Sequence, residues 1–378
     1  MKIVYVAPMF HTNQVPIVKG WLDQKYQVVF LSQYEGNTED HTYCTPCIMG
    51  YSGLFRFFRF VHCLRHKTER RTASYQEAFQ SKYGFPPVFR CFRFFREQDP
   101  DFVIIRESSL YSKFIYLICK VCRIRCILYN QLPLWDNEPP RNNLAHKIAK
   151  AFAPSVRMTP VLGNPDTGHL DEAAVYVPFV MEPHLPPADK TFSEDGCIRI
   201  LCVGRFEDRK NHLMLLEVLQ QLIPHYSLHL TLVGEVSTTY HELYYRRVEK
   251  YISAHHLEDC VTCHINCEPD RMSEFYCAAD LFVLPGNGEF ASISQLEAMS
   301  YSLPVIVSNT NGTACYVENG KNGYLFKNKN PDDLKEKILK IITDRESMLQ
   351  MGAYSYRLVQ EKHSFSNYQE KIEPLIYN

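Results

Sequence analysis

Residues 281–308 read LFVLPGNGEFASISQLEAMSYSLPVIVS and set out a strand, a turn, a helix and a second strand in order. The short apolar run Leu281–Leu284 predicts a buried parallel strand. Pro285–Gly288 has turn composition, and Ser292 is placed to cap the helix that follows. A proline then stops the helix and opens the apolar strand Val305–Val307. This succession predicts one repeat of an open α/β sheet.

Two glutamates occupy the edge of that predicted sheet. Glu289 follows the carboxyl end of the first strand, and Glu297 lies about a turn and a half into the helix. In open α/β sheets ligands bind at this edge. The main-chain N–H groups of Ala291–Ser294 have no partner inside a helix that begins here, so they would favour a phosphate or a sugar hydroxyl.

A second segment, residues 198–212, reads IRILCVGRFEDRKNH. Ile198–Val203 is expected to be a strand, Gly204 and Arg205 follow its end, and Lys210 precedes an expected helix over Leu213–Leu222. Fixed cations at such a place stabilise the negative charge that develops on a departing diphosphate. The alternative is that both are surface cations beside the neighbouring acidic residues.

Together these segments resemble the retaining glycosyltransferases of family four, which have the two-domain GT-B fold. The resemblance rests on Glu289, seven intervening residues, Glu297-Ala298-Met299 and Leu303-Pro304, together with Gly204-Arg205 and Lys210. It covers residues 198–376 well, whereas over 1–180 it is one of fold pattern only.

The resemblance implies a role for each matching residue. Arg205 and Lys210 would hold the donor diphosphate, Glu289 would orient the donor sugar, and Glu297 would bind the ribose hydroxyls. The remaining donor-side positions are Gly204, Ala291, Ser292, Ile293 and, in the loop that faces the base, Asn266. Because the cation pair replaces a bound metal, no metal and no cofactor besides the donor is expected.

Strands and helices alternate along both halves of the chain, which predicts two doubly wound, Rossmann-like parallel sheets. We expect an acceptor-binding domain over 1–180, a nucleotide-sugar-binding domain over 181–362, and a segment 363–378 that packs back on the first domain. The polar, proline-rich link Met181–Gly196 is a plausible hinge. Helices are expected at Leu110–Cys122 and Asn142–Phe152, and the resemblance implies a closing helix near Phe365–Ile376.

The composition is that of a globular protein, with 378 residues of which 46% are hydrophobic and 22% charged. The sequence offers neither a signal peptide nor an uninterrupted run of 18 apolar residues. Fourteen cysteines without an export signal favour a reducing compartment. Three cysteine clusters, near residues 44, 119 and 260, are more readily explained as buried thiols than as zinc sites. We therefore expect a cytoplasmic protein.

Charge is distributed unevenly, because residues 1–180 carry a net +7 and residues 181–378 a net −8. Residues 54–96 interleave phenylalanine with ten Lys and Arg. A helix with aromatic residues on one side and arginines on the other can lie in an anionic membrane interface, which would make the protein peripheral at the inner face of the cell membrane. The alternative is a helix pair that packs Phe55, Phe58, Phe89, Phe92 and Phe95 inward. Nucleic acid is not expected, since no binding module accompanies the stretch.

Candidates for the acceptor or sugar side lie in the first domain. The loop after the first strand has no glycine, which puts a phosphate contact from its backbone in doubt; its His11 either reaches the cleft or caps the next helix. The resemblance matches the run Leu128–Gln131 to the place where the family has a sugar-contacting histidine, with Gln131 at that position and Asn130 beside it. Trp135 and Asp136 suit a sugar face and its hydroxyls, and ordinary loop packing is the alternative for the indole.

The expected activity is therefore retaining transfer of a sugar from a UDP- or GDP-sugar to a hydroxyl of a glycan acceptor. A lipid-linked acceptor in envelope polysaccharide or glycoconjugate synthesis is expected by analogy. The alternatives are a sugar-nucleotide epimerase or a phosphorylase of the same fold, and a non-catalytic scaffold at a membrane. The sequence names neither the sugar nor the linkage.

Overall fold

The structure is a computed structural model, and it describes residues 1–36, 39–65, 79–80, 82–106, 109–136, 154, 156–192 and 196–377. The helix expected over Asn142–Phe152 lies outside these residues. Contacts between Cα atoms divide the chain into two compact units, one of residues 1–180 with 368–378 and one of residues 181–367.

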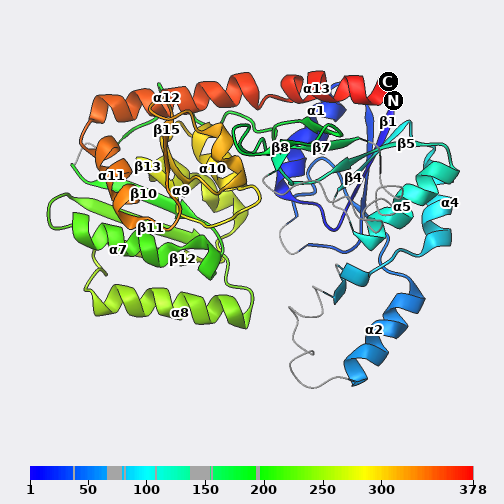
Figure 1. Cartoon of the computed structure of the whole chain (residues 1–378), viewed down its shortest axis with the longest axis horizontal. Coiled ribbons are helices and arrows are strands. Elements are labelled where there is room, and N and C mark those ends of the chain that lie inside the picture. The colour runs from blue at the N-terminus through cyan, green and yellow to red at the C-terminus, as the bar shows by residue number, and fades with distance from the viewer. Residues whose placement is uncertain are drawn as a thin grey trace. The chain divides into compact units, whose positions relative to one another are not determined.

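The first unit is built on a parallel sheet whose strand order, among the described residues, is β3-β2-β1-β4-β5-β7-β9 (Figure 1). Its central strand β1 is flanked by β2 and β4, so that Ile3 lies beside Val28 on one side and Phe102 on the other. The strands are β1 (Lys2–Ala7), β2 (Gln27–Ser32), β3 (Cys47–Ile48), β4 (Phe102–Arg106), β5 (Arg125–Tyr129), β7 (Arg157–Thr159) and β9 (Ala174–Tyr176). Apolar runs in the sequence predict β1, β2, β4, β5 and β9, because both faces of a parallel sheet are covered, whereas the short β3 and β7 were not predicted.

Helices cover both faces of this sheet. One face buries Val4, Val6, Val103 and Ile105 with side chains from α2, α4 and α5, and the other face carries α1 and α13. The helices are α1 (Val15–Asp23), α2 (Gly53–Arg65), α4 (Val88–Gln98), α5 (Leu110–Val121) and α13 (Phe365–Tyr377), with the short 3-10 helix η1 at Thr12–Gln14. A small antiparallel pair, β6 (Trp135–Asp136) and β8 (His169–Leu170), adjoins the sheet.

The C-terminal helix α13 packs on the first unit, as expected from the resemblance. The hydroxyl of Tyr368 lies 3.2 Å from the hydroxyl of Tyr5 on β1, and the Trp21 ring packs edge-on against Tyr368. Arg125 donates a hydrogen bond of 2.8 Å to the carbonyl of Ile376. The last residues of the chain therefore complete the core formed by the first strand.

The second unit has a parallel sheet with the order β12-β11-β10-β13-β14-β15 in the described part of the chain (Figure 1). Its strands are β10 (Ile198–Val203), β11 (Leu228–Gly234), β12 (Val261–Ile265), β13 (Leu281–Leu284), β14 (Val305–Ser308) and β15 (Gly323–Phe326). Its helices are α7 (His212–Leu222), α8 (Thr239–Ala254), α9 (Met272–Ala278), α10 (Ile293–Ser300), α11 (Pro331–Ile342) and α12 (Arg345–Lys362), with short 3-10 turns at Asp208–Lys210, Pro269–Arg271 and Gly312–Tyr316. The doubly wound α/β architecture predicted for both halves is confirmed.

Residues 54–96, which interleave phenylalanine with arginine, leave several of their phenylalanine side chains exposed. On α2 the Phe55 side chain is buried, whereas Phe57, Phe58 and Phe60 are exposed. On α4 the buried side chains are Cys91 and Phe95, and Phe89 is 90% exposed. The alternative in which the helix pair packs its phenylalanines inward is therefore wrong for Phe58 and Phe89. From α2, Phe55 contacts the rings of Tyr51, Phe79 and Phe85, and His62 stacks on Phe79. Within the described residues, no helix is both long and apolar enough to cross a membrane.

Candidate active site

Two neighbouring strands bring the predicted donor residues to one edge of the second sheet. In β10 and β13, Ile200 lies beside Leu281 and Leu201 beside Phe282, so both strands end at the same edge. Gly204 follows β10, and the loop that carries Glu289 follows β13. The hydroxyl of Ser294, in the first turn of α10, bonds to the carbonyl of Val203 at 3.3 Å. Parallel pairing thus joins two segments that are far apart in the sequence.

Lys210 and Glu289 form a buried ion pair at this edge. The Lys210 Nζ lies 2.7 Å from Glu289 Oε2, and only 11% of the lysine side chain and 4% of the glutamate side chain are exposed. Gly204 makes room for the lysine, because a Cβ at that position would lie 2.9 Å from Lys210 Cε. The absence of a side chain at Gly204 therefore lets the ammonium lie over the end of β10.

The other oxygen of Glu289, Oε1, is buried and accepts no hydrogen bond from the described residues. A Cβ at Gly286 would lie 2.3 Å from it, so Gly286 permits this close approach. The main chain of Glu289 is held as well, since the N–H of Gly312 donates to its carbonyl at 2.8 Å. An unsatisfied buried acceptor costs free energy, and natural proteins keep such groups mostly at functional positions.

Arg205 is not part of this ion pair. Its Nε lies 3.2 Å from Glu235 Oε2, and its side chain is 59% exposed. The two cations expected to hold the donor diphosphate thus make separate contacts, Lys210 with Glu289 and Arg205 with Glu235. An exposed ion pair of this kind is worth about 0–1 kcal/mol, so little free energy holds Arg205 in this orientation.

Glu297 is partly buried on α10 and accepts a hydrogen bond of 2.6 Å from the hydroxyl of Tyr276 on α9. Burial raises the pKa of Glu297, and the hydrogen bond from Tyr276 opposes this rise. Burial and the Glu297 charge together raise the pKa of Tyr276 well above its usual value, so the phenol stays protonated and donates. The sequence reasoning missed Tyr276; its place just before the apolar run Leu281–Leu284 was the only available signal.

The start of α10 lacks the predicted side-chain cap. Ser292 holds the N-cap position with extended backbone, but its hydroxyl lies 2.9 Å from the hydroxyl of Ser294 and caps no N–H. Ser292 is therefore the N-cap residue, as predicted, but its side chain forms no capping hydrogen bond. Ala291 and Ile293 are half-buried beside it. The N–H groups of the first turn have no partner within the helix and keep their capacity to bind an anion.

Asn266 braces its own loop. Its Oδ1 accepts from the N–H of Val236 at 2.8 Å, and its Nδ2 donates to the carbonyl of Val236 at 3.1 Å. Its backbone is left-handed, with φ 52°. Both ends of this amide are therefore engaged in joining the loops that follow β11 and β12.

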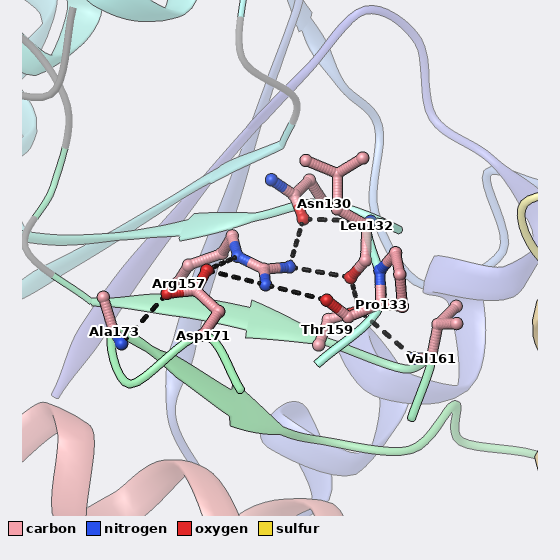
Figure 2. Close-up of polar contacts among 8 residues, drawn as sticks. All are labelled: Asn130, Leu132, Pro133, Arg157, Thr159, Val161, Asp171 and Ala173. Atoms are coloured by element: carbon pink, nitrogen blue, oxygen red, sulfur yellow. Dashed lines mark hydrogen bonds and ion pairs between the residues drawn. The ribbon is translucent and has the colours of Figure 1, made fainter. Parts of the chain in front are cut away.

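Figure 2 shows a cluster in the first unit that sequence reasoning did not identify, centred on Arg157 of β7. Its guanidinium donates to Asp171 at 2.9 and 3.0 Å, to Asn130 Oδ1 at 2.8 Å, and to the carbonyls of Leu132 and Pro133 at 2.7 and 3.1 Å. Thr159 adds a bond of 2.6 Å to the carbonyl of Leu132. The only sequence signal was a charged residue inside a short apolar run.

The acceptor-side candidates of the first unit lie in three separate local structures: the loop after β5, the β6–β8 pair and the start of η1. Asn130 accepts bonds from Arg157 and from the N–H of Leu132, which makes it part of the loop's own bracing. Gln131 follows it and is half-buried, whereas Trp135 and Asp136 form β6 and pair with β8. His11 stands at the start of η1, where its N–H donates to Gln14 Oε1 at 3.0 Å.

A largely apolar pocket lies on the α1 and α13 side of the first sheet, towards the carboxyl ends of β4 and β5. Arg106 is buried there, with its guanidinium 5.6 Å from the centre of the Tyr129 ring. The lining residues are Tyr5, Asn13, Gln14, Ile17, Ile104, Arg106, Tyr129, Met158, Val177, Pro178, Phe179 and Tyr368. Of the acceptor-side candidates, none lines it.

Within the part of the chain that the structure describes, no group of three or more His, Cys, Asp or Glu is arranged to hold a metal ion. Cys119 is buried against Cys126, and this contact together with burial raises the pKa of the Cys119 thiol. Such thiols behave as small hydrophobic groups.

The comparisons with known proteins point to one family. The family described as "Glycosyl transferases group 1" matches residues 188–358. An uncharacterized glycosyltransferase of Methanocaldococcus jannaschii is 27% identical over 156 residues, which is 40% of this chain and 40% of that protein. Spore coat protein SA of Bacillus subtilis is 27% identical over 181 residues, 46% of this chain and 47% of that protein. The sequence match thus spans less than half the length of these curated relatives.

Solved structures extend the likeness to the whole chain. Anabaena HepE in complex with UDP-glucose superimposes with a TM-score of 0.70, covering 100% of this chain and 99% of that one at 13% identity. At this identity the likeness establishes the fold, and it includes both units.

Proposed function

We propose that this chain is a glycosyltransferase of group 1, the family that matches its residues 188–358, and that it transfers a sugar from a nucleotide diphosphate sugar to an acceptor hydroxyl with retention at the anomeric carbon. The observation that carries the proposal is the buried contact of Lys210 with Glu289 beside the start of α10. An ammonium, a carboxylate with an unsatisfied oxygen and free helix N–H groups at one sheet edge suit a diphosphate joined to a polyol.

The proposed chemistry assigns a role to each group at this edge. When the bond between the anomeric carbon and the diphosphate breaks, negative charge grows on the departing phosphate oxygens, and Lys210 together with the first N–H groups of α10 stabilises that charge. Arg205 joins them by leaving Glu235, an exchange that its weak exposed ion pair permits. Glu289 accepts from a donor-sugar hydroxyl, and Glu297 accepts from the ribose. The acceptor oxygen forms the new bond, and its proton passes to the departing phosphate.

The donor is tested first, because its site lies within one unit. UDP-sugars are the first probes, since the structurally similar Anabaena protein is described in complex with UDP-glucose. We expect a UDP-, GDP-, ADP- and CDP-sugar panel to raise the melting temperature for one base selectively. We also expect slow release of the matching nucleotide, accelerated by membrane extract. A panel with no stabilisation and no release would refute the proposal.

For the acceptor, we propose the first unit and specifically the pocket at the ends of β4 and β5. Its walls are apolar, and Arg106 supplies a buried cation, so it suits an acceptor that combines an apolar surface with an anionic or polyol group. Arg106→Gln should lower transfer to the membrane-extract acceptor and leave donor hydrolysis unchanged. Equal loss of both reactions would indicate a structural role instead.

We also propose that α2 docks on an anionic membrane surface. Leu54, Phe57, Phe58 and Phe60 are all more than half exposed, with Phe60 at 61%, and α2 projects from the rest of the first unit (Figure 1). The surrounding stretch 54–96 has ten Lys and Arg and two acidic residues, which complements anionic headgroups. A peripheral position at the cytoplasmic face of the membrane, in envelope polysaccharide or glycoconjugate synthesis with a lipid-linked acceptor, would follow from this proposal.

Sedimentation with vesicles tests this docking. The protein should bind phosphatidylglycerol vesicles, bind phosphatidylcholine vesicles weakly, and dissociate as salt is raised. The double variant Phe57→Ser/Phe60→Ser should bind at least about tenfold more weakly, because burying each phenylalanine is worth about 1.5–3 kcal/mol. Leu243→Ser, which removes an exposed leucine on α8, is the control and should bind normally. Unchanged binding by the double variant would refute the docking role of α2.

A further inference from the structure

Tyr276 is buried on α9 and is not among the residues that would touch the donor. Its hydroxyl donates to Glu297 Oε2 at 2.6 Å. No other hydrogen bond to the Glu297 carboxylate is formed by the described residues, so Oε1 keeps its full capacity to accept from a ligand. One carboxylate oxygen is thus held by the protein while the other stays available.

The Tyr276 ring is fixed by its surroundings. It stacks on Tyr301 with ring centres 5.2 Å apart and planes 17° apart, and it contacts Phe282 of β13 at 6.4 Å. Tyr301 in turn stacks on His184, with ring centres 5.0 Å apart. A ring held on both sides in this way has little freedom to move its hydroxyl away from Glu297.

The backbone of Tyr276 is anchored by Lys190, which lies in the polar link at the start of the second unit. The buried Lys190 ammonium donates to the carbonyls of Tyr276, Cys277 and Ala279 at 3.1, 2.6 and 2.6 Å. These are carbonyls at the end of α9 that have no partner within the helix, and a cation at a helix C-terminus is favourable. Lys190 therefore fixes the turn of α9 from which Tyr276 reaches Glu297.

We propose that Tyr276, anchored by Lys190, is a positioning residue that holds Glu297 ionised and in one orientation for the ribose hydroxyls of the donor. This inference rests on the proposed function. The Tyr276 hydroxyl stabilises the ionised form of Glu297, because it donates a hydrogen bond that only the carboxylate accepts fully. Without that donor, the same burial would favour the protonated carboxyl, which offers a hydroxyl where the ligand needs an acceptor.

The proposal has a pH signature. Burial raises the pKa of Glu297, and the Tyr276 bond lowers it. The other titratable groups packed around the pair are the Lys190 ammonium, the Tyr301 phenol and the Cys202 and Cys277 thiols, with His184 stacked on Tyr301. Burial lowers the pKa of Lys190 to about 8, so this group changes charge on the alkaline side, away from the acidic limb set by Glu297. Removal of the Tyr276 hydroxyl should raise the Glu297 pKa further. As the pH is lowered, Tyr276→Phe should therefore lose donor binding at a higher pH than the wild-type protein does.

Tyr276→Phe tests the proposal, because it removes the hydroxyl and keeps the ring stack. Tyr301→Phe is the matched control, since it removes a phenol from the same stack that forms no hydrogen bond with Glu297. Calorimetry with UDP and GDP should show about tenfold weaker binding for Tyr276→Phe at neutral pH, with the acidic limb of the affinity profile shifted upward. Tyr301→Phe should match the wild-type protein in both respects.

A second measurement needs no ligand. The carboxyl carbon of Glu297, labelled with 13C and assigned through Glu297→Gln, should titrate at a higher pH in Tyr276→Phe than in the wild-type or the Tyr301→Phe protein. An unchanged titration overturns the positioning role even if binding is affected. If the wild-type protein binds neither nucleotide although the titration shifts as expected, the proposed donor site fails while the Tyr276–Glu297 bond stands.

Discussion

Replacing Lys210 with methionine should destabilise the second unit as well as abolish transfer. The variant leaves the Glu289 carboxylate, whose side chain is 4% exposed, without its counter-ion at 2.7 Å. Breaking a buried ion pair from one side costs about 3–5 kcal/mol, because a charge remains buried without a partner. For a unit of this size the melting temperature should fall by about 6–20 °C. Lys210→Met therefore lowers both catalysis and stability, and the two effects must be measured separately.

A double-mutant cycle separates them. Lys210→Met/Glu289→Gln removes both charges and should recover at least about 2 kcal/mol relative to Lys210→Met, while nucleotide release stays abolished. Arg209→Met is the control, because its ion pair with Glu207 is far more exposed and should be worth about 1 kcal/mol or less. Urea unfolding followed by circular dichroism measures five proteins, namely the wild type, Lys210→Met, Glu289→Gln, the double variant and Arg209→Met. The reasoning is refuted if Lys210→Met is as stable as Arg209→Met, or if the two substitutions of the cycle are additive.

Three further changes follow from contacts at defined atoms. Gly204→Ala should weaken nucleotide binding and destabilise the protein less than Lys210→Met does, because its Cβ, 2.9 Å from Lys210 Cε, shifts a flexible chain that can still reach Glu289. Gly234→Ala should lower the melting temperature strongly, because its Cβ would lie 2.1 Å from the carbonyl oxygen of Gly204. Calorimetry and thermal melting compare the two variants. Arg157→Lys should cost about 2–4 kcal/mol, since lysine cannot replace the five bonds of the guanidinium, and a shift in the emission of Trp135 should report the loosened loop. Hydrogen bonds from Lys362 and Tyr354 lower the pKa of Glu318 to about 2. The contribution of Glu318 to the free energy of unfolding, under about 1 kcal/mol, should therefore be present above pH ~4.5 and lost towards pH 2. The urea midpoints of the wild-type and Glu318→Gln proteins should accordingly converge as the pH is lowered.

Short-range patterns in the sequence were sufficient for the framework of the second unit. The apolar runs Ile198–Val203 and Leu281–Leu284 are strands with the predicted bounds. They are buried on both faces of a parallel sheet, and this burial is written locally as a continuous apolar run. The proximity of Lys210 and Glu289 needed more than these local runs, because β10 and β13 are neighbours in the sheet and not in the sequence, and only the family resemblance implied that the two segments meet.

Side-chain partners were decided only by the tertiary structure. Arg205 turns to Glu235, Glu297 to Tyr276 and Arg157 to the loop after β5, and each partner comes from a separate segment of the chain. A local pattern cannot encode such a choice, because it depends on rotamers and on the space left by other elements. The exposure of Phe58 and Phe89 likewise depends on the space in the core, which Phe55 and Phe95 occupy. The sequence thus determined which backbone segments meet, and packing in three dimensions determined which charges and rings they bring into contact.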